Sequence, residues 1–306
     1  MQSLLVSLPG AISQGVIWGI MAIGVYITFK ILDLADLTVD GTLGLGGIVM
    51  VVCTVNGMSI PLAMTIAFAA GCLAGFVTGI FHTKFGIPAI LAGILTQLSL
   101  YSIYLGISGG RANVTLSVMK YDVIVTLRNT TKSIIIGGIF CVVIIAVLYW
   151  FFGTEIGRSL RATGCNQAMS RANGINTNVN KVVGLILSNG LVGLSGALLA
   201  QYNGNADVNM GRGAIVIGLA AVIIGEVLFG KLFKNFALKL LAAVIGAIIY
   251  YIVLQLVLWF GLPTNYLKLF SAVVVALFLG IPYWQRQISG RRTREPKIDN
   301  GGAENA

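Results

Sequence analysis

The sequence has 306 residues, of which 57% are hydrophobic and only 10% are charged. A soluble globular chain carries roughly 25% charged residues, so this chain has too few to cover a water-facing surface and is predicted to cross a membrane several times. The net charge is +10, but the basic residues lie mostly in short segments beside apolar runs, which favours a membrane topology over nucleic-acid binding.

Apolar runs of about twenty residues, the length that spans a bilayer as an α-helix, recur along the whole chain. They predict an all-α polytopic membrane protein with about nine transmembrane helices, within a range of roughly eight to ten. The expected spans are residues 10–30, 40–56, 61–81, 88–107, 133–153, 181–202, 213–230, 237–260 and 266–284. The seventh is short and has glycines at its edges, so the sequence leaves open whether it is a full span or a broken, re-entrant segment.

The positions of lysine and arginine predict the orientation, because these residues stay on the cytoplasmic side during membrane insertion. With the N-terminus outside and about nine crossings, most of the 20 basic residues fall in cytoplasmic segments. We therefore expect a transmembrane domain over residues 1–285, with a cytoplasmic loop at 154–181, and a basic, disordered cytoplasmic tail over residues 286–306.

Three aspartates, Asp33, Asp36 and Asp40, interrupt the otherwise apolar segment 31–47, which is also rich in glycine. Polar backbone at membrane depth is tolerated only where it is buried in protein or lines a wet cavity. One interpretation is a discontinuous helix beside a translocation pathway, with Asp40 and Thr42 near its mouth. The other is a cytoplasmic turn whose acids are solvated. The residues by themselves favour neither.

Uncharged polar side chains inside other spans are further candidates for a pathway. Thr96 and Gln97 lie in the fourth expected span, and Asn189 lies in the sixth. Such groups can line a passage that binds a solute weakly. They can equally form hydrogen bonds between helices, which contribute about 0.6 kcal/mol each.

Small residues line one face of each of two expected spans. They are Gly71, Gly75 and Gly79 in the third span and Gly190, Gly193 and Ala197 in the sixth. Lipid offers no hydrophobic drive for helices to associate, so close packing through small residues takes its place. We expect these stripes to be packing faces, some of them at a dimer interface.

The longest polar interval between two apolar runs extends from Glu155 to Lys181 and carries four basic residues against a single acid. Within it, Asn166 is a favourable N-cap residue, and Gly174 is placed for a left-handed C-cap. An ordinary connector needs only a few polar residues. We therefore expect a compact helical knob held at the cytoplasmic face of the membrane.

A motif runs through this interval, and two other segments accompany it. The motif consists of Gly157-Arg158, Arg161-Ala162, Gly164-x-Asn166, Met169 and Gly174-Ile175-Asn176-Thr177. It resembles the coupling loop of ABC importer permeases of the branched-chain amino acid and ribose type. The apolar run Val182–Ala200 and the segment Asp33–Gly47 continue the resemblance, which covers most of the chain.

The resemblance implies a multi-pass permease of the bacterial inner membrane that imports a small solute. In this family the knob docks into a groove on a cytoplasmic ATPase subunit and transmits its closure to the membrane helices. The residues expected to contact the ATPase are Arg158, Arg161, Asn166, Gln167, Met169, Arg171, Gly174, Ile175 and Asn176. The other expected partners are an extracellular substrate-binding lipoprotein, a second permease copy and membrane lipid, while ATP is used by the partner subunit and no cofactor is expected in this chain. The expected solute is a branched-chain or aromatic amino acid, with nucleosides or simple sugars as alternatives.

Groups for catalysis or metal binding are missing from the expected spans. The chain has one histidine, His82, and its four cysteines form no C-x-x-C pair, so we predict neither an enzyme nor a metal site. Ion-coupled transporters commonly place ionisable residues inside the bilayer, and the best candidate here, Glu226, lies at a helix end near Lys231. An ion-coupled secondary transporter or a channel is therefore the alternative to an ATP-driven permease.

Overall fold

The structure is a computed structural model that describes residues 2–117, 121–230, 232–259, 269–278 and 280. Within these residues, seven helices are long and apolar enough to cross a membrane, and two shorter apolar helices cover Ala214–Phe229 and Leu269–Phe278. The seven long helices match the first six expected spans and the eighth. The ninth expected span lies only partly within the described residues, and the tail lies outside them.

The first helix, α1 (Gln2–Tyr26), continues through a π-helical turn, η1 (Ile27–Ile31). The other labelled helices are α2 (Thr38–Val55), α3 (Ile60–Thr83), α4 (Ala89–Ile107), α5 (Thr130–Gly153), α6 (Glu155–Cys165), α7 (Gln167–Ala172), α8 (Thr177–Asn203), α9 (Ala214–Phe229) and α10 (Phe236–Trp259). Two short strands, β1 (Asn113–Thr115) and β2 (Asn205–Asp207), form an antiparallel ribbon in which Val114 pairs with Ala206.

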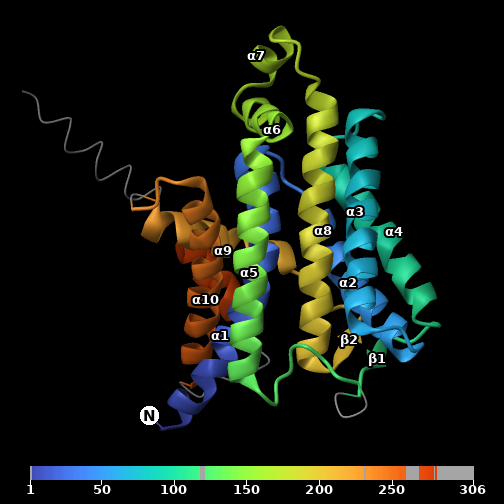
Figure 1. Ribbon diagram of the computed structural model, residues 1–306, viewed down its shortest axis with the longest axis vertical. Helices are drawn as coiled ribbons and strands as arrows, with labels where there is room; N and C mark the ends of the chain where they lie inside the picture. The colour runs from blue at the N-terminus through green and yellow to red at the C-terminus, as the bar shows by residue number, and fades with distance from the viewer. Residues whose placement is uncertain (1, 118–120, 231, 260–268, 279, 281–306) are drawn as a thin grey trace, which may run out of the picture.

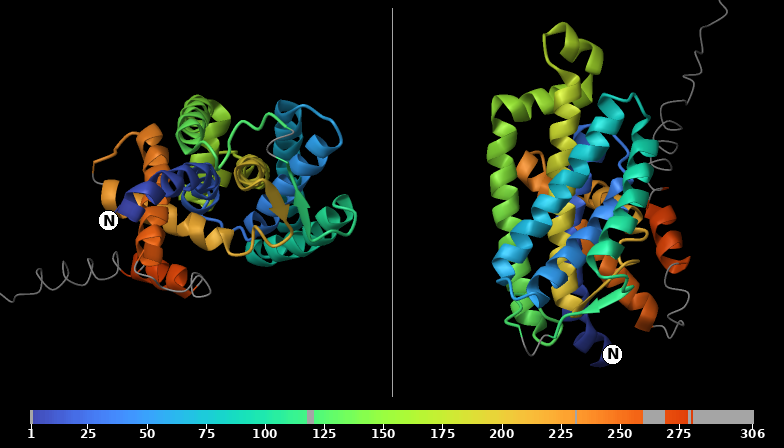
Figure 2. Two further views of the ribbon diagram at one scale, coloured as in Figure 1. Left: turned by 90° about the horizontal axis from the view of Figure 1, so that it is seen from below. Right: turned by 90° about the vertical axis from the view of Figure 1, so that its right-hand side faces the viewer.

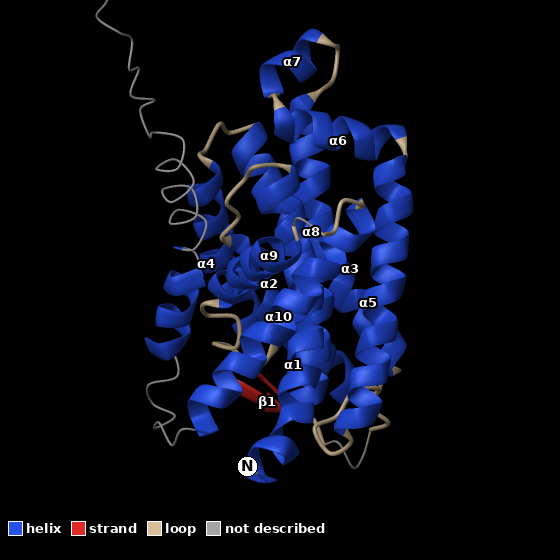
Figure 3. Cartoon of the chain, turned by 90° about the vertical axis from the view of Figure 1, so that its left-hand side faces the viewer, coloured by secondary structure: helices blue, strands red, loops and turns tan. Residues whose placement is uncertain are grey.

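Helix α8 is the central element of the bundle. It packs against α1, α2 and α3, while α5, α9 and α10 also pack against α1. Figure 1 shows α6 and α7 at one end of the long axis and the N-terminus with the β1–β2 ribbon at the other. In Figure 3 loops lie at both of these ends, and further loops run between the helices inside the bundle. Long apolar runs form helices here because a helix satisfies its backbone hydrogen bonds internally, which lipid cannot do.

Glycine allows neighbouring helices to approach α8 closely. A Cβ atom on Gly46 of α2 would overlap the carbonyl oxygen of Gly193, and one on Gly71 of α3 would overlap the carbonyl oxygen of Asn189. The packing stripes expected on the third and sixth spans are confirmed, because they face one another between α3 and α8. They are therefore buried within one chain and are not free to contact a second copy.

Helix α9 is a half-length element that begins inside the bundle. After α8 the chain forms β2 and turns back along α2, where the N–H groups of Gly213 and Ile215 donate to the carboxylate of Asp40. Asp40 lies in the first turn of α2, and Thr42 bonds to Asn189 near the middle of the 27-residue helix α8. Both α2 and α9 thus start level with the middle of α8. The seventh expected span is therefore broken: an irregular segment comes first, and the half-helix α9 then continues to the α7 end of the bundle, where Glu226 pairs with Lys30 and Phe236 contacts Arg161.

Candidate functional site

A buried polar cluster lies where the loop between η1 and α2 meets α8. Asp36 is only 3% exposed, and its carboxylate accepts hydrogen bonds from Nδ2 of Asn189 (2.7 Å) and from the backbone N–H of Thr38 (2.9 Å). Thr42 Oγ1 in turn donates to Oδ1 of Asn189 at 2.7 Å. A buried polar group is destabilising unless it is hydrogen-bonded, so these contacts stabilise the irregular entry into α2.

Threonine hydroxyls extend the cluster from α2 to α3 and α4. The Oγ1 atoms of Thr38 and Thr78 are 2.8 Å apart, and Thr78 Oγ1 donates to Thr96 Oγ1 at 2.8 Å. The structure therefore brings the pathway candidates Thr42, Thr96 and Asn189 into one hydrogen-bond network. This network links four helices at the depth where α2 begins.

Asp36 is the buried acid that sequence reasoning did not single out. Among the aspartates of its segment Asp33 is exposed and Asp36 is buried, which supports the discontinuous helix over the solvated turn. Glu226 was the expected candidate for an ionisable residue inside the membrane. It forms an ion pair with Lys30 (2.6 Å), and its side chain is half-exposed, which is consistent with a position at a helix end. The local pattern Asp-Leu-Thr is typical of an Asx-turn, but it does not tell whether the turn is buried, because the partner Asn189 lies 153 residues away.

Asp40 joins the N-terminal ends of two helices. One carboxylate oxygen accepts from the N–H of Gly213 (2.9 Å) and the other from the N–H of Ile215 (2.8 Å), at the start of α9. The N-terminus of a helix has unpaired N–H groups and a partial positive charge, so a carboxylate between two such ends is stabilised by both. Asp40 thereby sets the level in the bundle at which α9 begins.

A cavity of about 330 Å³ lies beside Asp40. Its lining includes Asp40, Gln97, Tyr101, Tyr104 and Arg212. The rings of Tyr101 and Tyr104 meet edge to face with centroids 5.6 Å apart, and Tyr104 Oη donates to a backbone carbonyl of the returning segment at 2.9 Å. The remaining pathway candidates, Asp40 and Gln97, therefore share one cavity that combines a carboxylate, a guanidinium and aromatic rings.

Residues of the types that bind metals do not cluster within the described part of the chain. No three His, Cys, Asp or Glu side chains there come close enough together to hold a metal ion. All four cysteines are free thiols, and Nδ1 of His82 lies 2.8 Å from the carbonyl oxygen of Ile87. The one histidine is thus engaged in holding a turn.

Helix α7 projects from one end of the bundle, beyond α6 (Figures 1 and 2). Its N-cap is Asn166, whose side chain accepts from the N–H of Met169 at 3.0 Å. At its other end Gly174 has a φ of +77°, and the N–H groups of Gly174 and Ile175 return to carbonyls of the last turn in a Schellman motif. Both predicted caps are confirmed.

Two helices, rather than the single one expected, build this knob. Helix α6 lies across the end of α5 and buries Leu160 completely. Its N-cap is Thr154, and the N-cap of α8 is Asn176, whose side chain accepts from two backbone N–H groups. Each connection from α5 through to α8 is therefore held by a capping side chain.

The residues expected to contact an ATPase occupy two places. On and beside α7, Met169 is 54% exposed. Asn166, Arg171, Gly174 and Asn176 are also exposed, Gln167 and Ile175 are half-buried, and Arg158 is exposed on α6. Arg161 lies apart from them, because its guanidinium stacks on the rings of Phe236 and Phe152, at 4.0 and 5.4 Å from their centroids. Arg161 thus faces the end of the bundle rather than the surface of α7.

Comparison with known proteins places this arrangement in a family. Residues 8–281 match the family described as "Branched-chain amino acid transport system / permease component". A tyrosine transport system permease protein of Clostridioides difficile is 39% identical over 267 residues, which are 87% of this chain and 88% of that protein. An uncharacterized protein of Rickettsia prowazekii is 35% identical over 276 residues, which are 88% of this chain and 95% of that protein.

A more distant relative comes from another transport system. The autoinducer 2 import system permease protein LsrC of Salmonella paratyphi B is 28% identical over 198 residues, which are 63% of this chain and 55% of that protein. The family match extends over nearly the whole chain, and the described residues include seven helices of membrane-spanning length. The chain is therefore a multi-pass protein of the bacterial cell membrane and belongs to the branched-chain amino acid transport system permease family, whose members are ABC importer permeases.

Proposed function

We propose that this chain is the subunit of an ATP-binding cassette importer that forms the translocation pathway for an amino acid. The observation that carries the proposal is α7, a short helix that projects from the bundle, is capped at both ends and exposes Met169 with several polar side chains. A groove on a cytoplasmic ATPase subunit would receive this helix. ATP would bind and be hydrolysed on that subunit, and this chain would need no cofactor of its own.

The caps around α7 give a path by which movement of the helix would reach the interior. Displacement of α7 would pass to α5 through the turn at Thr154 and to α8 through the turn at Asn176. Helix α8 carries Asn189, which bonds to Asp36 and Thr42 at the start of α2. A displacement of α7 would therefore move the polar cluster. The capped helix ends favour transmission of the displacement, because a helix with frayed ends would absorb it.

The cavity beside Asp40 supports an amino acid as the solute. An amino acid carries an ammonium and a carboxylate, and the cavity offers Asp40 and Arg212 as groups of opposite charge. Tyr101 and Tyr104 supply aromatic faces against which a branched-chain or aromatic side chain would pack. The relative named for tyrosine transport favours an aromatic amino acid, and nucleosides or simple sugars are the competing solutes.

The end opposite α7 would face the outside and meet a substrate-binding lipoprotein. The β1–β2 ribbon and the exposed Arg111 and Arg128 lie in the segments at that end. Basic residues at the α7 end support its cytoplasmic placement, and they include Lys30, Lys84, Arg158, Arg171, Lys234 and Lys239. A second copy of the chain would complete the pathway as a homodimer.

One observation, the buried Asp36, favours the alternative of an ion-coupled secondary transporter. A carboxyl group buried among helices in a membrane protein is normally functional, and proton or sodium binding is a common role. The contacts of Asp36 with Asn189 and Thr38 account for it equally well as a structural group. ATP-driven import remains the proposal because the projecting α7 has no evident role in a transporter that works alone.

The proposal is tested by the energy source and by the partners of the purified protein. We expect an ATPase subunit to co-purify with the tagged chain from its native membrane. Proteoliposomes that contain the whole assembly should take up labelled L-tyrosine or L-leucine only when ATP is supplied on the ATPase side. Uptake driven by a proton or sodium gradient, with no ATPase in the preparation, would contradict the proposal and favour the alternative.

Arg212→Gln should reduce uptake of an amino acid about tenfold, because the cavity would lose the cation expected to pair with the solute carboxylate. The measurement is the initial rate of labelled L-tyrosine uptake by cells that carry the transport system, corrected for the amount of permease in the membrane. Lys84→Gln is the control, since Lys84 is exposed, lies outside the cavity and is not among the residues expected to contact a partner. Equal rates in the Arg212 variant and the control would remove this cavity from the pathway.

A further inference from the structure

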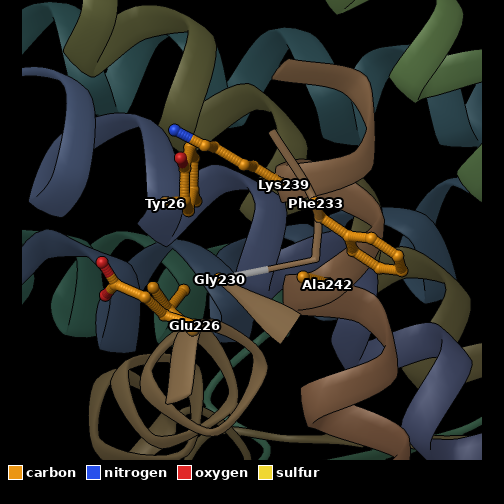
Figure 4. A pocket seen from close by; sticks show the side chains of 7 residues that line it. Tyr26, Glu226, Gly230, Phe233, Lys239 and Ala242 are labelled. Atoms are coloured by element: carbon orange, nitrogen blue, oxygen red, sulfur yellow. The ribbon is translucent and has the colours of Figure 1, made fainter. Parts of the chain in front are cut away.

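A second, basic cavity of about 350 Å³ lies at the end of the bundle that carries α7. Its lining includes Tyr26, Lys30, Arg161, Lys234, Phe236 and Lys239. A smaller cavity of about 110 Å³ shares Tyr26 and Lys239 with it and is also lined by Glu226 and Phe233 (Figure 4). Four cationic side chains from α1–η1, α6 and the region that opens α10 therefore converge on one space.

Arg161 is the best-positioned of these cations. Its guanidinium stacks on Phe236 and lies beside Phe152, which restricts its orientation, and its Nε atom is buried without a hydrogen-bond partner in the described part of the chain. No ion pair joins Arg161 to an acid within the described part of the chain, where the one salt bridge is Lys30–Glu226. Arg161 is half-buried, and a partly desolvated cation without an anionic partner is unfavourable, so its preformed guanidinium points to an anionic ligand.

The described residues around this cavity carry a net positive charge, even when the one acidic side chain beside it is counted. Among the described residues, Glu226 is the single acid that lines the two cavities, and it is engaged with Lys30 at 2.6 Å. In Figure 4 the side chain of Lys239 extends over Tyr26 and away from Glu226. Arg161, Lys234 and Lys239 thus remain as three cations around one space that no acid of the described residues compensates.

We propose that this basic cavity binds the phosphate group of an anionic ligand. A planar guanidinium together with flexible ammonium groups suits phosphate oxygens, since arginine donates in a fixed fork and lysine adds point charge. A basic pocket between helices at a membrane end is the usual place for an anionic lipid headgroup, and a free phosphate compound offers the same chemistry. The bound phosphate would bridge α1, α6 and α10 beneath the knob and so stiffen the support of α7.

The test uses the purified full-length chain in a neutral detergent and measures its thermal unfolding midpoint at fixed ionic strength. The probes are phosphatidylglycerol, phosphatidylcholine as the neutral lipid, and inorganic phosphate. We expect phosphatidylglycerol to raise the midpoint and phosphatidylcholine to leave it unchanged. The double variant Lys234→Gln/Lys239→Gln should bind the anionic lipid about 30-fold more weakly, which corresponds to about 2 kcal/mol for two lysines.

Matched variants keep the outcome interpretable. Lys84→Gln removes an exposed lysine at the same end but outside the cavity, and it should respond as the unmodified chain does. Arg161→Gln should abolish the stabilisation by phosphatidylglycerol. If Arg161→Gln does not fold, the double lysine variant tests the site in its place, because both lysines are exposed. Stabilisation by inorganic phosphate alone would support the site and identify a free phosphate compound as its ligand. No stabilisation by either phosphate-bearing probe, or an equal response in the Lys84 and double lysine variants, would overturn the proposal.

Discussion

Replacing Asp36 by alanine is expected to lower the free energy of unfolding by about 3 kcal/mol, because two buried donors would lose their acceptor. Those donors are Nδ2 of Asn189 and the backbone N–H of Thr38, at 2.7 and 2.9 Å from the carboxylate. The residue is 3% exposed, so water would replace the lost contacts poorly. The loss should appear as a lower thermal unfolding midpoint in detergent and as reduced solute uptake by the reconstituted assembly.

The isosteric change Asp36→Asn separates hydrogen bonding from charge. An asparagine at this position can still accept from Thr38, and rotation of the Asn189 amide by half a turn restores a donor–acceptor pair between the two amides. After that rotation Asn189 would donate to Thr42 instead of accepting from it, which a hydroxyl permits, but its Nδ2 would no longer donate to the carbonyl oxygen of Leu185, now 3.1 Å away. We therefore expect Asp36→Asn to fold with a loss of about 1 kcal/mol. A loss as large as that of Asp36→Ala would show that the negative charge, and not the network, stabilises this region.

Replacing Gly174 by valine is expected to weaken association with the ATPase at least about tenfold while leaving the permease in the membrane. At a φ of +77° a residue with a Cβ atom is strained by about 1 to 2 kcal/mol, and a β-branched residue by more. Apart from its chain neighbours, no atom in the described part of the chain lies within 4 Å of the point that a Cβ at Gly174 would occupy, so the strain comes from the backbone and not from a clash. The variant would therefore open the C-terminal turn of α7 without disturbing the bundle.

The control for this change is Gly174→Asn, because asparagine adopts the left-handed conformation at moderate strain and preserves the Schellman motif. Co-purification of the ATPase with each tagged variant, at matched membrane levels, is the measurement. Gly174→Asn should retain most of the ATPase and Gly174→Val should lose most of it. Equal retention by both variants would mean that the cap of α7 is not needed for the proposed coupling.

Much of the fold and part of the site could be predicted from the sequence because the signals are local. The membrane spans follow from hydropathy over about twenty residues, and the seven long helices lie where they were expected. The caps of α7 follow from the conformational preferences of Asn166 and Gly174, which bond within the same turn. The glycine stripes on α3 and α8 were identified as packing faces for the same reason, although their partner was not.

What the sequence determined by itself is the set of apolar helices and the capped knob, since each depends on residues a few positions apart. Tertiary structure decided the rest through contacts between distant positions. Asp36 is buried because Asn189, 153 residues away, donates to it, and α9 starts inside the bundle because Asp40 holds an N–H group 173 residues away. Arg161 left the expected contact surface because Phe152 and Phe236 offer it ring faces from two other helices. Burial of a charged group depends on which partners the fold brings to it, and no local pattern carries that information.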